Sequence, residues 1–134
     1  MRWRKEEKEF VSVARTARVA TVDGRGVPHN VPVCPLLDGE TICFATEKRA
    51  KKLRNIESNA AVAIVIDDYT EAWDRIRGIM IQGKARTVGR AEFKRLRKRL
   101  YVKFLQYRTA SPIGDSDSVI VRVAPEKKFS WGFE

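Results

Sequence analysis

The stretch that organises the chain runs from Thr41 to Asn59 and reads TICFATEKRAKKLRNIESN. Its apolar residues at 42–44 predict a short strand. The pair Ala45-Thr46 predicts a break after this strand, and the remaining residues predict a helix over 48–57. Four cations fall in the first two turns of this expected helix: Lys48, Arg49, Lys51 and Lys52. Because the backbone already makes a helix N-terminus positive, cations at this end lower stability unless an anion binds among them.

The same end of the helix contains the parts of an anion site. Thr46 stands where an N-cap residue is expected, with its hydroxyl near the free N–H groups of the first turn. Together with the ammonium groups of Lys51 and Lys52, these groups predict a site of phosphate size. A solvated basic face on a surface helix is the alternative, and spacing alone does not separate the two. Leu53 and Ile56 belong to a buried stripe from which the lysines are excluded.

Composition fits one domain, which we expect to span residues 1–134. The chain has 27 Lys and Arg against 17 Asp and Glu, a net charge of +10, which keeps nucleic acid among the partners to consider. Two separated cysteines and one histidine, His29, do not supply a zinc site. The first ten residues have no apolar run of a signal peptide, and no segment reaches the roughly 18 apolar residues of a membrane span. A cytoplasmic protein without membrane contact is therefore expected.

Two strands are predicted before the organising stretch. RVATVD at 18–23 is rich in β-branched residues, and VPHNVPVCPLL at 27–37 is extended but carries three prolines. Three missing N–H donors predict that the second strand lies at an edge, is bulged, or runs beside something other than a strand. A hairpin turn is expected at Asp38-Gly39. A two-residue turn there places a proline where the ladder needs a donor, so we expect a shifted register, with Cys34 and Cys43 as small buried hydrophobic residues.

Two more strands are predicted after the organising stretch. AAVAIVI at 60–66 is a continuous apolar run, which predicts a strand covered on both faces. A polar loop at 67–74 carries two aromatic residues, Tyr69 and Trp73, which plug the core or line a site or interface. The next strand, at 75–88, contains two glycines that we expect to mark bulges or close approach, Gly78 and Gly83.

Amphipathic helices are predicted at 3–16, with Glu7 on the exposed side, and at 91–106. The second helix is expected to turn six cations toward water: Lys94, Arg95, Arg97, Lys98, Arg99 and Lys103. A strand at 118–124 and an aromatic cluster at 129–133 end the chain. About six mostly antiparallel strands and three helices predict a mainly β (α+β) fold in which the sheet forms a closed or partly closed barrel.

Several motifs match one known family in order. The stretch at 44–66 contains Thr46 after a strand, the Lys51-Lys52 pair, Asn55-Ile56 in a helix, and then a buried strand; the segment Gly83-Lys84-Ala85 follows later. In these features the chain resembles the FMN-binding split-barrel family, also called the pyridoxamine-phosphate-oxidase-like family. The resemblance covers residues 10–90 well and the C-terminal strand loosely. The segments IDDYTEAWDRIR, QYR and WG resemble the subgroup of deazaflavin-dependent oxidoreductases.

The resemblance implies a homodimer of six-stranded Greek-key split barrels with flanking helices and with cofactor sites at the subunit interface. It implies that the cofactor phosphate lies on Thr46, Lys51 and Lys52, the same site that charge placement predicts. Arg49 beside this site would suit the longer acidic tail of a deazaflavin coenzyme.

The resemblance also implies a place for the cofactor ring. The ring would rest against the strand that contains Asn30, Val31 and Val33, whose main chain meets the polar edge of the ring. Residues of the partner subunit would cover it, and Trp73 and Trp131 are the candidates. The prolines of this strand fit a strand that faces a ligand.

The implied function is an oxidoreductase that uses FMN or, alternatively, a deazaflavin coenzyme, with hydride transfer on an unknown small substrate. Where the vitamin-making oxidases carry an Arg-Gln pair, this chain has Gly78-Ile79, so oxidation of pyridoxamine phosphate is not expected. No side chain stands out as a catalytic acid; Tyr69 and Tyr107 are candidates for proton donation, with packing as the alternative. A flavin-binding carrier or sensor without turnover is one alternative. A nucleic-acid binder that uses the basic helix 91–103 is another, although that helix has few base-reading side chains and matches no nucleic-acid motif.

Overall fold

Seven strands form one antiparallel sheet in the computed structural model, which describes residues 2–133. Their order is β2-β1-β5-β6-β7-β4-β3. The strands are β1 Ala17–Val22, β2 Pro28–Val33, β3 Leu36–Asp38, β4 Thr41–Glu47, β5 Ala61–Asp68, β6 Arg77–Thr87 and β7 Ser118–Trp131. The helices are α1 Lys5–Val13, α2 Lys51–Ser58 and α3 Arg90–Lys103, with 3-10 turns η1 at Trp73–Arg75 and η2 at Leu105–Arg108.

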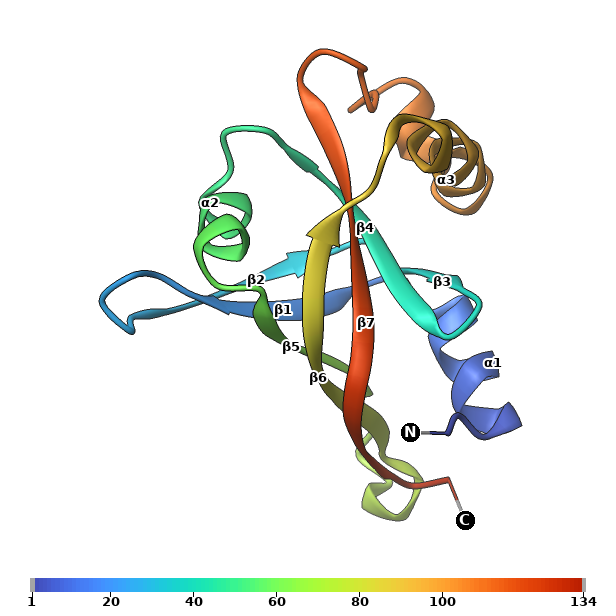
Figure 1. Ribbon diagram of the computed structural model, residues 1–134. Helices are drawn as coiled ribbons and strands as arrows, with labels where there is room; N and C mark the ends of the chain where they lie inside the picture. The colour runs from blue at the N-terminus through green and yellow to red at the C-terminus, as the bar shows by residue number, and fades with distance from the viewer. Residues whose placement is uncertain (1, 134) are drawn as a thin grey trace.

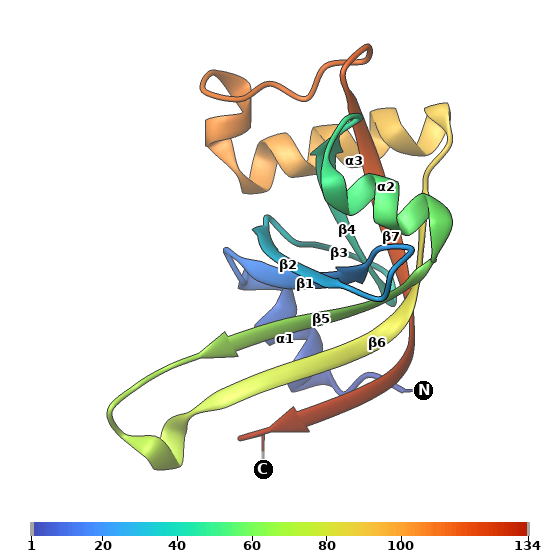
Figure 2. The ribbon, with the colours of Figure 1, turned by 90° about the vertical axis from the view of Figure 1, so that its left-hand side faces the viewer.

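The sheet curls into a half-barrel, with β2 and β3 as its two edge strands (Figure 1). The predicted mainly β, partly closed barrel is confirmed, but the strand count is seven rather than six. The extended run at 27–37 divides into β2 and β3, because Cys34 and Pro35 interrupt it. The predicted strand at 118–124 and the start of the aromatic cluster, up to Trp131, belong to one strand, β7, which bends along its length with β6 (Figure 2).

A bulge makes the long β6–β7 pair possible. The register shifts between Gln82 and Gly83, where Pro125 of β7 faces Gly83. A Cβ atom at Gly83 would lie 2.2 Å from the carbonyl oxygen of Ala124, so only glycine allows this approach. Gly78 has a similar role, since its missing Cβ makes room for the ring of Trp131. Both glycines therefore mark close approach, as predicted.

The proline-rich strand lies at an edge, as predicted, because β2 pairs only with β1. The register shift in the following hairpin is also confirmed. Leu36 pairs with Cys43, and Asp38 pairs with Thr41, so the turn lies one residue later than expected. Cys43 is fully buried, whereas Cys34 is only half-buried.

Two apolar clusters hold the fold together. One fills the half-barrel and includes Phe44, Ile64 and Ile81 of the strands, with α1 and α2 closing over it. The other lies between the sheet and α3, where the predicted inner stripe of the helix is buried. Burial of these large side chains supplies most of the favourable free energy of folding. No helix within residues 2–133 combines the length and apolar character needed to cross a bilayer.

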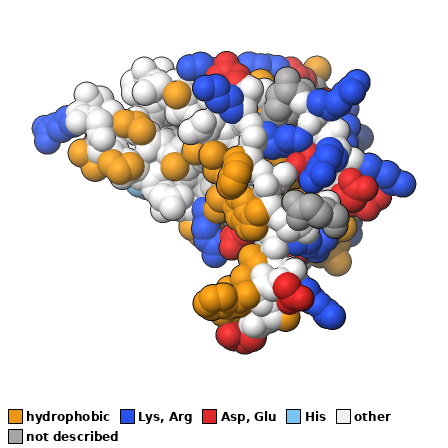
Figure 3. All heavy atoms as spheres, turned by 90° about the horizontal axis from the view of Figure 1, so that it is seen from below, with side chains coloured by type: hydrophobic (Ala, Val, Ile, Leu, Met, Phe, Trp, Pro, Cys, Tyr) orange, Lys and Arg blue, Asp and Glu red, His pale blue; other side chains and the backbone are white. Residues whose placement is uncertain are grey.

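The prediction that the apolar strand at 60–66 is covered on both faces is wrong. Burial alternates along β5, so Ile64 is buried while Ala63 and Val65 are half-exposed. Val65 pairs with Met80 of β6, which pairs with Phe129 of β7. These side chains form an apolar row on the outer face of the sheet. Hydrophobic side chains also gather on the surface seen from below (Figure 3).

The six cations of α3 do not all face water as predicted. The guanidinium groups of Arg95, Arg99 and Arg122 converge on the carboxylate of Asp38, with N···O distances of 2.7 to 3.0 Å. The hydrogen bond from Arg95, followed by that from Arg122, holds the pKa of Asp38 well below its usual value, although burial acts in the opposite direction. Asp38 therefore ties α3 to the β3–β4 turn, a link that no local periodicity could reveal.

Glu7 is a second correction. Its side chain was expected on the exposed side of the first helix, but it is 1% exposed and accepts a 2.6 Å hydrogen bond from Lys128 of β7. Burial raises the pKa of Glu7, but hydrogen bonds from Lys128, Ser130 and the N–H of Arg4 outweigh it and hold that pKa below its usual value. A charged pair thus fastens α1 to the end of the sheet.

Candidate functional site

The organising stretch folds differently at its centre from the prediction. Strand β4 continues to Glu47 because β7 supplies pairing partners that far, with Thr46 opposite Val119. Helix α2 then begins at Lys51, and its N-cap is Ala50, which has no capping side chain. Thr46 as N-cap is therefore wrong, and Lys48 and Arg49 precede the helix instead of lying in its first turns.

The position of Thr46 nevertheless makes its hydroxyl available to a ligand. The residue is 7% exposed, and its Oγ1 atom is buried without a hydrogen-bond partner within residues 2–133. It lines a cavity of about 280 Å³ between the end of β4, the start of α2 and the loop that follows η2. Since buried hydroxyl groups nearly always find a partner, an unpaired one beside a cavity is a candidate contact for a ligand.

Lys52 supplies the cation of this cavity. Its ammonium group is half-buried, and burial lowers its pKa, an effect that Glu47 partly offsets. Glu47 and Asp117 also line the cavity, so it is not uniformly positive. The N–H groups of Lys51 and Lys52, the first two of α2, lie at the same end and lack intrahelical acceptors, whereas that of Leu53 already donates to the carbonyl of Ala50. One hydroxyl, one ammonium and a helix N-terminus fit an oxyanion of phosphate size.

Lys51 and Arg49 stand apart from the cavity lining. The Nζ atom of Lys51 lies 3.9 Å from a carboxylate oxygen of Asp23, in the turn between β1 and β2. Arg49 is exposed, and its carbonyl accepts a hydrogen bond from Arg54. Neighbouring lysines of one helical turn therefore point to different surroundings, with Lys52 toward Thr46 and Lys51 toward the β1–β2 turn.

The sequence offered Tyr107 as a candidate proton donor, with packing as the alternative, and did not place Cys34 in this site. Tyr107 lines the cavity with Thr46 and Lys52. Cys34, the residue after β2, contacts the side chain of Tyr107. Burial and then the neighbouring Cys34 raise the pKa of Tyr107, so its phenol stays protonated at neutral pH. Through this contact the end of β2 reaches the cavity.

The free edge of β2 presents one main-chain donor. The N–H of Asp23 donates to the carbonyl of Val27, which directs the main chain of odd-numbered β2 residues toward β1. The even-numbered residues face the open edge, and two of these, Pro28 and Pro32, have no N–H. Asn30 therefore offers the edge its N–H, its carbonyl and an exposed side chain.

Val31 and Val33, which were expected beside the ring, direct their side chains inward. Val33 is buried in the half-barrel core, and Val31 packs against that core. Both also turn their main-chain polar groups toward β1, by the same alternation. Of the three β2 residues predicted to meet a cofactor, Asn30 alone has polar groups at the open edge.

The two tryptophans lie at the other end of the sheet. Trp73 is 73% exposed in the connection between β5 and β6, and Trp131 ends β7 with its ring over Gly78. Both views place this end of the molecule far from α2 (Figure 1, Figure 2). Neither tryptophan is brought to the Thr46 cavity within one chain. Their predicted role therefore requires a second copy.

Comparison with known proteins places this geometry in context. A family model described as pyridoxamine 5'-phosphate oxidase matches residues 4–132. A 5a,11a-dehydrotetracycline/5a,11a-dehydrooxytetracycline reductase from Streptomyces rimosus is 32% identical over 93 residues, a match covering 66% of this chain and 66% of the reductase. The chain thus spans just under two thirds of that relative.

Solved structures share the fold. HutZ, the heme storage protein from Vibrio cholerae, matches with a TM-score of 0.80 and 22% identity, over 96% of this chain and 94% of HutZ. A FAD-binding protein from Mesorhizobium loti matches with a TM-score of 0.75 and 17% identity, over 93% of this chain and 90% of that protein. At these identities the likeness concerns the fold alone.

Proposed function

Since this chain belongs to the pyridoxamine 5'-phosphate oxidase family, we propose that it is an oxidoreductase that binds FMN or, alternatively, a deazaflavin coenzyme beside α2. The observation that carries the proposal is the unpaired, buried hydroxyl of Thr46 in a cavity that also receives Lys52. The reductase among its relatives supports oxidoreductase chemistry. Oxidation of pyridoxamine phosphate itself is not part of the proposal.

In this proposal the chain supplies binding and orientation. Thr46, Lys52 and the N–H groups that begin α2 hold the phosphate, and Lys51 adds positive charge from the adjoining turn. The Asn30 N–H, on the open edge of β2, meets the polar edge of the ring. When bound, the ring supplies hydride transfer to or from a small substrate. The protonated phenol of Tyr107 can donate a hydrogen bond into the same cavity.

We further propose that two copies associate through the outer face of the sheet. Val65, Met80 and Phe129 form an apolar row there, and Phe129 is 63% exposed. An exposed apolar surface of this kind is typical of a protein interface. Association would also bring Trp73 and Trp131 of the partner subunit toward the ring, which one chain alone cannot do.

Titration of FMN and of a deazaflavin coenzyme into the purified protein, followed by visible absorbance and fluorescence, tests the cofactor. Lys52→Met should weaken the binding of the preferred cofactor by about 1.5–3 kcal/mol, the range for a lost charged hydrogen bond. Lys51→Met should weaken it less, because Lys51 already faces Asp23. Lys94→Met, which removes an exposed cation of α3, serves as the control. Equal affinity in Lys52→Met and Lys94→Met would contradict the proposed phosphate site.

Two other functions, the predicted carrier or sensor and a heme protein suggested by the structural comparison, give different outcomes. A carrier or sensor would bind cofactor but reduce no offered substrate when a reductant is supplied. A heme protein, as some proteins with this fold are, would show a Soret band with heme and no binding of either flavin-type cofactor.

The dimer can be tested by sedimentation of Phe129→Glu, since this exposed residue can accept a charge without a change in the core. A monomer with weakened cofactor binding is the expected result, and an unaltered mass would exclude this interface.

A further inference from the structure

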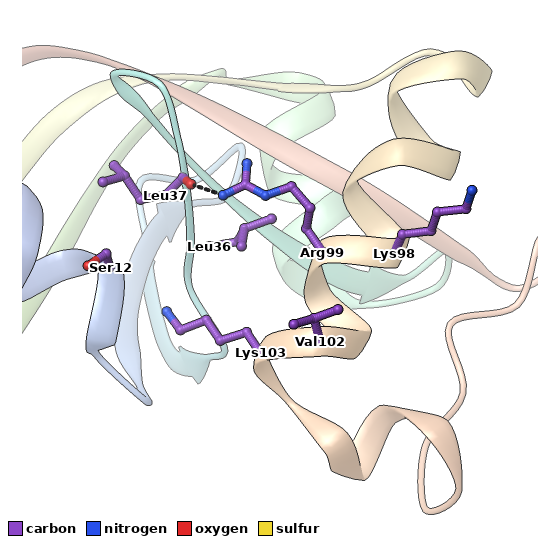
Figure 4. A pocket seen from close by; sticks show the side chains of 7 residues that line it. All are labelled: Ser12, Leu36, Leu37, Lys98, Arg99, Val102 and Lys103. Carbon is purple, nitrogen blue, oxygen red and sulfur yellow. Dashed lines mark hydrogen bonds between the residues drawn. The ribbon is translucent and has the colours of Figure 1, made fainter.

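A second cavity lies beside β3 and shares no lining residue with the α2 site. It has a volume of about 390 Å³, is open to solvent and is lined by α1, β3 and the C-terminal half of α3. Leu36, Leu37 and Val102 give it apolar walls, and Lys103 reaches across it toward Ser12 (Figure 4). Val102 is 70% exposed at its mouth. The volume lies within the range of small-molecule sites.

The positive charge of Lys103 at this cavity is not balanced by a carboxylate of residues 2–133. The Nζ atom of Lys103 donates a 2.6 Å hydrogen bond to the carbonyl of Pro35, and the ammonium forms no ion pair with a carboxylate of residues 2–133. Arg15 lies close by, with its guanidinium 4.4 Å from the centre of the Phe104 ring that Lys103 also approaches, at 5.1 Å. Arg99 is already bound to Asp38. Arg15 and Lys103 thus approach one aromatic ring, and neither forms an ion pair with a carboxylate of residues 2–133.

We propose that this cavity binds a small amphiphilic carboxylate, with its carboxylate on Lys103 and its apolar body against Leu36, Leu37 and Val102. A half-buried cation with only a neutral acceptor is poorly compensated, so an incoming carboxylate stabilises it. The apolar walls favour a ligand with a hydrocarbon body over a small inorganic anion, because burial of that body adds to the affinity. Charge complementarity and shape therefore point to one class of ligand.

The site should also depend on pH. Burial, with Arg15 next in effect and Arg99 acting in the same direction, lowers the pKa of Lys103 to about 8, while Cys34 acts in the opposite direction. Below that value the ammonium is present and attracts a carboxylate. As pH rises through it, the charge is lost and the affinity for the carboxylate falls. The affinity for an uncharged ligand of the same shape should not change in this way.

Calorimetric titration of decanoate into the full chain at pH 7 tests the proposal, with decanol as the uncharged probe. Lys103→Met should weaken decanoate binding about tenfold or more, as expected for a lost charge-assisted hydrogen bond. Val102→Glu, at an exposed position, should also weaken it by repulsion without a change in thermal stability. Lys94→Met, on α3 but outside the cavity, should leave it unchanged.

Three results would overturn the proposal: no decanoate binding at millimolar concentration, equal binding of decanoate and decanol, or equal decanoate affinity in Lys103→Met, Val102→Glu and the unaltered protein. A fall in decanoate affinity between pH 7 and pH 9.5, with no change for decanol, is the expected pH result, since the charge on Lys103 is lost over this interval. FMN affinity should be unaltered in Val102→Glu, which separates this cavity from the one beside α2.

Discussion

The hydroxyl of Thr46 gives a test in which two measurements should move in opposite directions. In the cofactor-free protein the Oγ1 atom is buried without a partner, on a residue that is 7% exposed. Such a group costs about 1–3 kcal/mol of stability. Thr46→Val removes the hydroxyl and keeps the branched shape at a strand position. We therefore expect the free energy of unfolding without cofactor to rise by about 1 kcal/mol, which for a chain of this size raises Tm by about 3–5 °C.

Cofactor binding should respond in the other direction. If Thr46 donates to a phosphate, its loss removes a hydrogen bond to a charged group, worth about 1.5–3 kcal/mol. That corresponds to a dissociation constant about ten to a hundred times larger. The assays are urea unfolding of the cofactor-free protein and fluorescence titration of FMN or the deazaflavin coenzyme. Thr87→Val, at the exposed end of β6, is the matched control and should alter both quantities little.

The two measurements together can refute the reasoning. A hydroxyl with a structural role would make Thr46→Val less stable by 1 kcal/mol or so, as expected for a lost internal hydrogen bond. Unaltered cofactor affinity with a rise in stability would mean that the phosphate binds elsewhere. Only a gain in stability with a loss of affinity supports a hydroxyl that is held unpaired for a ligand.

Two further predictions concern stability. Asp38→Asn should lower the free energy of unfolding by about 2–4 kcal/mol at pH 7. This is less than the loss of a fully buried ion pair would cost, because two of the three arginine partners of Asp38 are half-exposed. Asp38 has a lower pKa in the folded protein than in the unfolded chain. Its stabilisation is therefore fully present at pH values above the unfolded pKa and is lost as pH falls through the folded pKa. The free energies of unfolding of Asp38→Asn and of the unaltered protein, measured in urea, should therefore converge in acid. Gly83→Ala should cost about 1–3 kcal/mol in the same assay, since the new Cβ meets the Ala124 carbonyl. Gly24→Ala, with nothing within 4 Å, is its control, and equal stability of the two glycine variants would refute the steric argument.

Local pattern was enough to predict the position of most strands and the inner face of α3, but not the division of 27–37 into β2 and β3 or the full length of β7. Alternation and apolar runs located β1, β5 and β6, and the helical spacing of apolar residues identified the buried stripe that packs on the sheet. Prolines predicted an edge strand because a missing N–H is tolerated only where no neighbour needs it. The cations before and at the start of α2 drew attention to the part of the chain that lines the Thr46 cavity.

The sequence could not predict which partner each strand, polar group or charged side chain finds in the folded protein. Pairing with β7 extends β4 to Glu47, which moves the start of α2 and changes the role of Thr46 from a cap to an unpaired buried hydroxyl. Packing alone sends Lys52 toward the cavity and its neighbour toward Asp23.

The ion pairs also depend on residues that are far apart in the chain. Glu7 is buried because a lysine 121 positions away reaches it, and Asp38 gathers three arginines from two distant segments. Periodicity in a sequence reports which face of an element avoids water, since that depends on the element alone. Which charge meets which, and which polar atom is left without a partner, depends on segments far apart in the chain, and only the folded arrangement decides it.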